Sequence, residues 1–287
     1  MKIAIAGGSG FVGSSVCSAL RKRGHQIHLI TRGDLEQNTD QFRQSLGRCD
    51  WMVNCVGCTK PNSDAGRLVN TFFPMELYKR SRDIVTEGFL HVSSVAATGS
   101  ISQPGQWIFE DSPENPDSDY GRTKLEGDKR LRDCSSSDKK VCILRPPVLY
   151  GAKAGGVFGL LRKSALVGLP LPFSNLQNRR SFMFIDNFSE AVIAAIFAKL
   201  EGTHITVDHE PLSPAEIYDM MTIAAGKGQR TFSLGTISEP LIKLALKNRA
   251  SSLLNDACYS GEKFRQLTGY VPKYSQREAF EITMHRY

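Results

Sequence analysis

In the first half of the chain, short runs of apolar residues alternate with stretches in which apolar residues recur at helical spacing. Short apolar runs with the length and flanks of buried strands lie at 2–6, 26–30, 50–56, 89–94 and 141–147. Residues 11–23, between the first two runs, have helical spacing instead. Strands separated by helical stretches predict an α/β fold of the Rossmann type, with a doubly wound parallel sheet.

The pattern changes after Gly151. Helical spacing returns near 213–226, 237–248 and 275–284, without the regular strands of the first half. We therefore predict a Rossmann-type domain over 1–150 and a smaller C-terminal α/β domain over 151–287. Part of 182–207 is expected to return to the first domain.

Composition and charge restrict the classes of partner. The chain has 287 residues, of which 41% are hydrophobic and 23% charged, and this is ordinary for a globular protein. Its net charge is +7, yet the basic residues are spread out and not interleaved with aromatics. We expect an anionic small molecule as partner and no nucleic acid.

No apolar stretch approaches membrane-spanning length, and the opening MKIAIAGGSG lacks the core of a secretory leader. The prediction is a cytoplasmic protein with no membrane partner.

The seven cysteines do not resemble a disulfide framework. Their number is odd and they are scattered from Cys17 to Cys258, so a reducing compartment is expected. Cys55 and Cys58 form a C-x-x-C, but a zinc site would need a second ligand pair at suitable spacing. We predict no metal site and interpret both as small buried residues, with a redox pair as the alternative.

A glycine-rich segment, GGSGFVG at 7–13, follows the first predicted strand and opens the first helix. It fits G-x-G-x-x-G from Gly8 or G-x-x-G-x-x-G from Gly7. In both cases glycines permit a tight turn, and backbone amides at the helix N-terminus face a pyrophosphate. The candidate cofactor-binding residues of this loop are Gly7, Gly10, Phe11, Val12 and Gly13. The domain over 1–150 is accordingly predicted to bind NAD(P), and the domain over 151–287 mainly the substrate.

The end of the second predicted strand, LITRGD, bears on the choice of cofactor. In dinucleotide-binding folds an acid at this place favours the ribose hydroxyl of NAD, and an arginine favours the 2′-phosphate of NADP. Arg32 lies at the strand end and Asp34 two residues further on. A guanidinium can bind a phosphate through two hydrogen bonds, so we predict NADP, with NAD as the alternative.

The segment YGRTK places Tyr120 and Lys124 four residues apart, on the same side of a helix. Such a pair also occurs on ordinary surface helices, so the spacing alone does not establish chemistry. An ammonium about 4 Å from a phenolate would stabilise it by on the order of 4 kcal/mol at an effective dielectric constant of 20. That would bring the pKa of the tyrosine close to neutrality, where proton transfer is efficient.

Several motifs together resemble one family. They are GGSGFVG at 7–13, VSSVAATG at 92–99, YGRTK at 120–124, LRPPVLYG at 144–151, RSFMFIDN at 180–187 and SGEKFRQLTGYVP at 260–272. In this order they resemble the extended short-chain dehydrogenase/reductases, the branch of nucleotide-sugar epimerases, dehydratases and 4-ketoreductases. GLPLPF and NRRSFMFIDN look most like the bacterial subgroup that acts on UDP-linked sugars.

The resemblance implies catalytic roles. Tyr120 is the expected acid/base, and Lys124 is expected to lower its pKa and to bind the nicotinamide ribose. The register of the S-[ST]-x-x-V-Y-G pattern selects Ser94 as the catalytic hydroxyl, with Ser93 as the alternative. The family often has V-Y-G where this chain has ATG, so Thr98 replaces a tyrosine that commonly lines the substrate pocket.

The resemblance also implies substrate contacts. Asn70 falls on an asparagine that supports the active site, and Arg180 on an arginine that binds a substrate diphosphate. A solvated loop arginine remains the alternative for Arg180. Between Arg32 and Asp50 the chain is shorter than in fuller members, which have a third strand there, and GDL at 33–35 is interpreted as its remnant.

The expected function is hydride transfer on a nucleotide-linked sugar. The candidates are a UDP-hexose or UDP-N-acetylhexosamine 4-epimerase and a 4-ketoreductase, both NAD(P)-dependent and both served by the same motifs. A reductase of a non-sugar ketone and a non-catalytic NADP-binding structural or sensor protein are the alternatives. The resemblance is also compatible with a homodimer formed through the helix that carries Tyr120.

Overall fold

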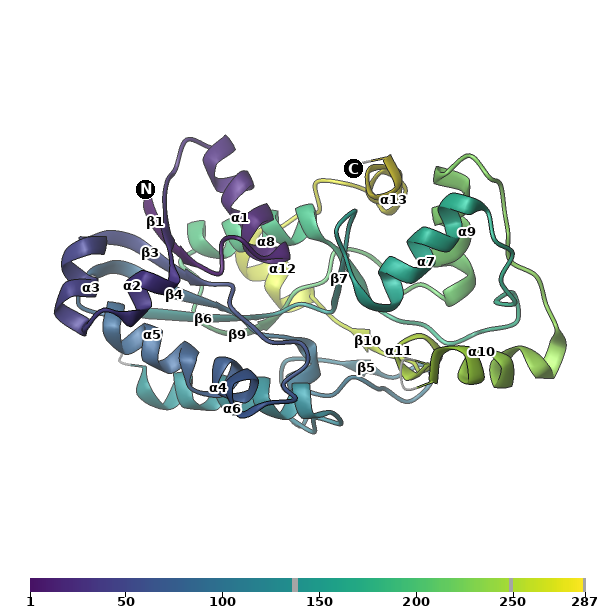
Figure 1. Cartoon of the computed structure of the whole chain (residues 1–287), viewed down its shortest axis with the longest axis horizontal. Helices are drawn as coiled ribbons and strands as arrows, with labels where there is room; N and C mark the ends of the chain where they lie inside the picture. Colours follow the sequence, from purple (N-terminus) through teal and green to yellow (C-terminus); the bar gives the residue numbers. More distant parts are fainter. Residues whose placement is uncertain (136–138, 248–249, 286–287) are drawn as a thin grey trace.

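The computed structural model describes residues 1–135, 139–247 and 250–285, which form two lobes (Figure 1). The larger lobe contains a six-stranded parallel sheet in the order β2-β1-β3-β4-β6-β9. These strands are β1 (Lys2–Ala6), β2 (Gln26–Ile30), β3 (Cys49–Asn54), β4 (Val85–Val92), β6 (Lys140–Arg145) and β9 (Gly202–Ile205). The predicted doubly wound α/β fold is confirmed.

Helices cover both faces of this sheet. Figure 1 shows α1 (Phe11–Lys22), α8 (Ile185–Phe197) and α12 (Glu262–Thr268) above it, and α4 (Asp64–Thr71), α5 (Phe73–Ser81) and α6 (Asp119–Cys134) below it. None of the helices in the described ranges is long and apolar enough to cross a membrane.

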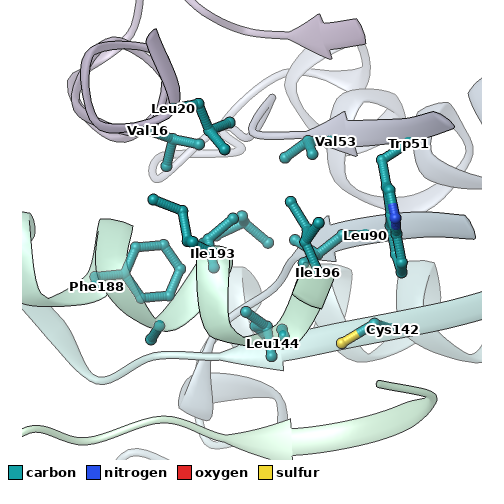
Figure 2. Close-up of a cluster of buried hydrophobic side chains, with 14 of the residues drawn as sticks. Val16, Leu20, Trp51, Val53, Leu90, Cys142, Leu144, Phe188, Ile193 and Ile196 are labelled. Atoms are coloured by element: carbon teal, nitrogen blue, oxygen red, sulfur yellow. The ribbon is translucent and has the colours of Figure 1, made fainter. Parts of the chain in front are cut away.

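Successive residues of a strand point to opposite faces of the sheet, so they belong to different hydrophobic clusters of the core. In β1, Ile3 and Ile5 belong to the cluster that includes Val16 and Leu20 of α1, part of which Figure 2 shows. Ala4 and Ala6 belong to a second cluster, on the side of α5 and α6. Because both faces of the sheet are buried, its strands are almost continuously apolar, and this made them recognisable in the sequence.

Between β2 and β3 the chain forms two short helices, α2 (Arg32–Glu36) and α3 (Thr39–Leu46), and not the strand remnant expected at 33–35. Each begins with a capping box, Thr31 with Asp34 and Asn38 with Gln41. These reciprocal side-chain bonds satisfy the first amides of a helix and so favour helix over strand.

The smaller lobe is built around a cluster of aromatic rings. Tyr150 stacks on Phe158 and Phe280, with ring centroids 5.0 Å away in both cases. Its helices are α7 (Gly156–Val167), α9 (Pro214–Ala224), α10 (Ser238–Leu246), α11 (Ser251–Leu254) and α13 (Gln276–His285). Two small sheets accompany them: β7 (Val148–Tyr150) with β8 (Phe182–Phe184), and β5 (Trp107–Ile108) with β10 (Cys258–Tyr259).

Candidate active site

The glycine loop brings α1 directly against the end of β1. Gly7 has φ +77°, and its carbonyl accepts a hydrogen bond from the amide of Gly10 at 3.0 Å. A Cβ on Gly13 would lie 2.1 Å from the Gly7 oxygen, so no larger residue fits there. Within the described residues no side chain caps the first turn of α1. The amides of Phe11, Val12 and their neighbours are therefore available to an anion, and the loop fits a pyrophosphate.

The two candidates for the adenosine ribose differ in their surroundings. Arg32 is exposed in the first turn of α2, directly after β2. The carboxylate of Asp34 accepts bonds from the amide and hydroxyl of Thr31, at 2.8 and 2.7 Å. Asp34 would have to leave its cap to meet a ribose hydroxyl, whereas Arg32 would not.

Helix α6 presents Tyr120 and Lys124 one turn apart. The helix is capped by the hydroxyl of Ser118, which accepts from the amide of Gly121 at 3.1 Å. Tyr120 is half-buried, while Lys124 is only 3% exposed. The Lys124 Nζ donates to the carbonyl of Val92, the last residue of β4, at 3.1 Å. Both candidates therefore lie at the carboxyl end of the central strands, where open α/β sheets bind ligands.

Ser94 follows β4 and reaches the same place. It starts the short 3-10 turn Val95–Ala97, where its hydroxyl accepts a hydrogen bond from the amide of Ala96 at 3.2 Å. The same hydroxyl lies close enough to the side chain of Tyr120 to lower the pKa of that phenol. The alternative, Ser93, is buried and donates to Asp128 at 2.9 Å. A Cβ on Gly121 would lie 2.2 Å from the carbonyl oxygen of Ala96, so α6 and the serine turn are in direct contact. The structure thus brings Ser94, Tyr120 and Lys124 together.

The charge state of Tyr120 differs from the expectation. Burial raises the pKa of Tyr120 to about 12, the nearby hydroxyl of Ser94 works against this rise, and the charge of Asp128 adds to it. Lys124 is not among the described groups that lower this pKa. With its own pKa of about 8, Lys124 is already neutral at the pH where the phenol would ionise, so it has no positive charge to stabilise the phenolate. The expectation that Lys124 brings the phenol close to neutrality is therefore wrong for the protein without a ligand.

Lys124 is itself strongly affected by its surroundings. Burial lowers the pKa of its ammonium to about 8, although the negative charge of Asp128 opposes this fall. A buried ammonium with a pKa this close to neutral pH is uncommon in a structural role and more typical of functional sites.

Asn70 supports the site from inside the protein. It is completely buried, and its side chain accepts from the amide of Cys58 at 2.9 Å. The same side chain donates to the Cys58 carbonyl at 2.8 Å and to Thr123 of α6 at 3.0 Å. It therefore ties the loop after β3 to α6. This corrects the expectation that Asn70 contacts substrate, because none of its surface is accessible.

Arg180 connects segments that lie far apart in the chain. Its backbone pairs with Leu212 and bridges to Ala257. Its side chain is 6% exposed and donates to the carbonyls of Asn255, at 2.7 Å, and Ser100, at 3.3 Å. The burial shows that Arg180 is not a solvated loop arginine, while its contact with a substrate diphosphate stays a prediction. The neighbouring Arg179 is the exposed one, paired with Glu216 at 3.3 Å.

The cysteine pair lies beside the candidate site. Cys55 and Cys58 are half-buried free thiols in the loop after β3. Burial raises the pKa of Cys55 to about 12, which makes that thiol a poor nucleophile. Within the described residues no group of three or more His, Cys, Asp or Glu could hold a metal ion.

Sequence reasoning missed a buried polar network next to the site. Asp128 and Arg145 are almost fully buried and are joined by a 2.9 Å ion pair. Arg145 also donates to Thr98 at 3.1 Å, so Thr98 points into the protein and not into a pocket. The available signal was spacing, because Asp128 follows Lys124 by four residues and so lies on the same face of the helix.

Comparison with known proteins now assigns the family. Residues 3–207 match the model of the NAD dependent epimerase/dehydratase family. The chain belongs to this family. It is 26% identical to UDP-glucose 4-epimerase from Vibrio cholerae, over 78% of this chain and 76% of that protein. It is 22% identical to 2-alkyl-3-oxoalkanoate reductase from Stenotrophomonas maltophilia, over 97% of both.

A solved structure with the same fold is UDP-N-acetylglucosamine 4-epimerase from Bacillus cereus, with a TM-score of 0.79. The two proteins are 20% identical, and the match covers 98% of this chain and 97% of the other. The family, the glycine loop and the fold agree on a nicotinamide-dependent oxidoreductase or epimerase.

Proposed function

We propose that the protein is an NAD(P)-dependent epimerase or 4-ketoreductase of a nucleotide-linked sugar, with a UDP-hexose or UDP-N-acetylhexosamine as substrate. The observation that carries the proposal is the direct contact of α6 with the serine turn, which brings Ser94 next to Tyr120, with Lys124 buried one helical turn away. This arrangement supports a catalytic protein over a cofactor-binding structural or sensor protein, which would not need it.

The chemistry follows from the three side chains. A substrate oxygen between Ser94 and Tyr120 would accept hydrogen bonds from both hydroxyls. With a pKa of about 12, Tyr120 keeps its proton at neutral pH, so it can donate that proton to a carbonyl oxygen during reduction. Ser94 orients and polarises the carbonyl. Lys124 remains close to Tyr120 and can contact a ribose hydroxyl. A bound nicotinamide supplies or accepts the hydride.

For the cofactor we propose NADP(H). Two features support this choice: Arg32 is exposed directly after β2, and the carboxylate of Asp34 is engaged by Thr31. A guanidinium there can pair with a 2′-phosphate, while the acid that NAD would require is held in a helix cap.

The sugar substrate is supported by the names of the relatives, and a second candidate by the structure. The Vibrio cholerae and Bacillus cereus proteins are UDP-sugar 4-epimerases by name. However, the guanidinium of Arg180 donates to main-chain carbonyls and so does not offer itself to a diphosphate. This observation favours reduction of a non-sugar ketone as the second candidate, and the Stenotrophomonas relative is by name a reductase of an oxoalkanoate.

The test is a thermal-shift and turnover screen carried out once with NADPH and once with NADP⁺, because reduction of a ketone needs a hydride donor and epimerisation begins with oxidation of the sugar. One set of compounds contains UDP-, dTDP- and GDP-sugars, and the other contains 3-oxoalkanoates and aromatic ketones. A ligand at 100 times its Kd stabilises the native state by about 2.7 kcal/mol, which is readily detected. Stabilisation by a UDP-sugar, followed by its conversion, supports the first candidate. Turnover of ketones alone replaces it by the second, and NADPH binding without any turnover would contradict both.

A further inference from the structure

The buried pair Asp128 and Arg145 lies between the two segments that carry the proposed catalytic residues. We propose that this pair is a positioning device: it fixes the Ser94 turn against α6, so that Ser94 faces Tyr120 and Lys124. The inference rests on the proposed function and extends it to residues that touch neither substrate nor cofactor.

Asp128 joins α6 to the start of the serine turn. It lies one helical turn after Lys124 and is completely buried. Its Oδ2 accepts a hydrogen bond from the hydroxyl of Ser93 at 2.9 Å and one from the Nε of Arg145 at 2.9 Å. Ser93 directly precedes Ser94, so the backbone that aims the Ser94 hydroxyl is held by the helix that carries Tyr120.

Arg145 holds the other end of the turn. It is the last residue of β6 and is 1% exposed. One terminal nitrogen donates to the hydroxyl of Thr98 at 3.1 Å and the other to Glu114 at 2.6 Å. The pair therefore bonds the residue before Ser94 and the residue four positions after it. Movement of the turn relative to α6 would break a charge-assisted hydrogen bond in a dry environment, which is costly.

The carboxylate of Asp128 also affects the pKa of Lys124. The ionisable groups packed around Lys124 and Asp128 are Tyr120 of α6, His91 of β4, Arg145 of β6 and Cys55 of the loop after β3. Burial lowers the pKa of Lys124, and the negative charge of Asp128 raises it. Burial likewise lowers the pKa of His91 well below its usual value, so this imidazole is neutral near pH 7. Asp128 therefore favours the protonated form of Lys124 in a site that otherwise disfavours it.

The first experiment loosens the turn without changing any charge. Thr98→Val removes the acceptor of Arg145, and Ser93→Ala removes the donor to Asp128. We expect each to lower kcat about tenfold while KM and the Kd for NADPH stay within twofold, since only orientation changes. Glu126→Gln, on the exposed side of α6 and paired with Arg130, is the control and should leave kcat unchanged. Wild-type kcat in both Thr98→Val and Ser93→Ala would overturn the proposal.

The second experiment needs no substrate and therefore separates this inference from the proposed function. The pKa of Lys124 is measured by NMR titration of protein labelled with ¹³C-lysine, with Lys124→Met to assign the signal. In Asp128→Asn we expect the midpoint to lie about 1 pH unit below that of the wild type, because a nearby opposite charge has been removed. An unchanged midpoint in folded protein would overturn the coupling. Should Asp128→Asn not fold, the kinetic result for Thr98→Val and Ser93→Ala decides the inference.

Discussion

The buried ammonium of Lys124 lowers the free energy of unfolding of the protein. A Lys pKa that falls from 10.5 in the unfolded chain to about 8 in the folded protein corresponds to roughly 3 kcal/mol against folding while the ammonium is charged. The unfolded chain binds the extra proton between these two pKa values. The cost is therefore fully present below about pH 8 and is relieved as the pH rises toward 10.5.

From this we expect Lys124→Met to be more stable than the wild type at pH 7. The gain should be about 2 kcal/mol, because the lost hydrogen bond to Val92 offsets about 1 kcal/mol of the relieved cost. It should decline to near zero by pH 10. Urea denaturation at both pH values measures it, and an equal difference at pH 7 and pH 10 would argue against a depressed pKa.

A second prediction concerns Arg32 and the choice between NADPH and NADH. Arg32→Ala should weaken NADPH binding about ten- to a hundredfold and leave NADH binding almost unchanged, since a charge-assisted contact to phosphate contributes roughly 1.5 to 3 kcal/mol. Asp34→Ala, which removes only a helix cap, is the matched control and should not change the preference. Fluorescence titration with both cofactors provides the measurement. Equal affinities in the wild type would mean that NADP is not the preferred cofactor.

The sequence predicted the role of some residues and not the position of others. Ser94, Tyr120 and Lys124 were identified from motifs, and the structure brings them together. For Arg179 and Arg180 the sequence offered no means to decide which one is exposed. The decision comes from the backbone pairing of Arg180 with Leu212, which connects segments far apart in the chain.

At the scale of elements, the contact between α6 and the serine turn depends on the absence of a side chain at Gly121. An alanine Cβ there would meet the carbonyl oxygen of Ala96 at 2.2 Å, so α6 would have to move away from Ser94. Gly121→Ala should lower kcat at least tenfold and destabilise the fold by about 1 to 3 kcal/mol. Gly33→Ala in α2, where the nearest atom is 3.7 Å away, should do neither. Equal behaviour of the two variants would contradict this close contact.

The sequence predicted some elements better than others. The apolar runs at 2–6, 26–30, 50–56 and 141–147 gave β1, β2, β3 and β6 to within one or two residues. For β1, β3 and β6, burial on both faces makes the strands distinctive in the sequence. The helices α2 and α3 were not predicted, although their capping boxes are visible in the sequence. The edge strand β9 has only four residues, and its place is set by its pairing with β6.

At the scale of the whole molecule, the chain leaves the sheet after β6, builds β7 and α7 of the smaller lobe, and returns with α8 and β9 (Figure 1). Arg180 lies on this return and donates to carbonyls of Ser100 and Asn255, in two other segments. We therefore expect Arg180→Ala to lower the free energy of unfolding by about 2 to 3 kcal/mol, because buried carbonyls lose a charged donor.

The matched control is Arg179→Ala, which removes an exposed ion pair with Glu216 and a hydrogen bond to the carbonyl of Pro211, and which should change stability by about 1 kcal/mol or less. Urea denaturation of the two variants and calorimetry with UDP distinguish the possible roles of Arg180. If Arg180→Ala were as stable as the wild type but had lost affinity for UDP, the residue would be a ligand contact and not a structural tie.

The central claim is that Tyr120 transfers the proton in a hydride-transfer reaction. Its most direct test is kcat of Tyr120→Phe, measured with NADPH and the substrate that the screen identifies. The substitution removes one hydroxyl and leaves the ring in place, so the Kd for NADPH and the melting temperature should remain close to those of the wild type. We expect kcat to fall by about two to four orders of magnitude. A folded Tyr120→Phe protein with near wild-type turnover would contradict the account.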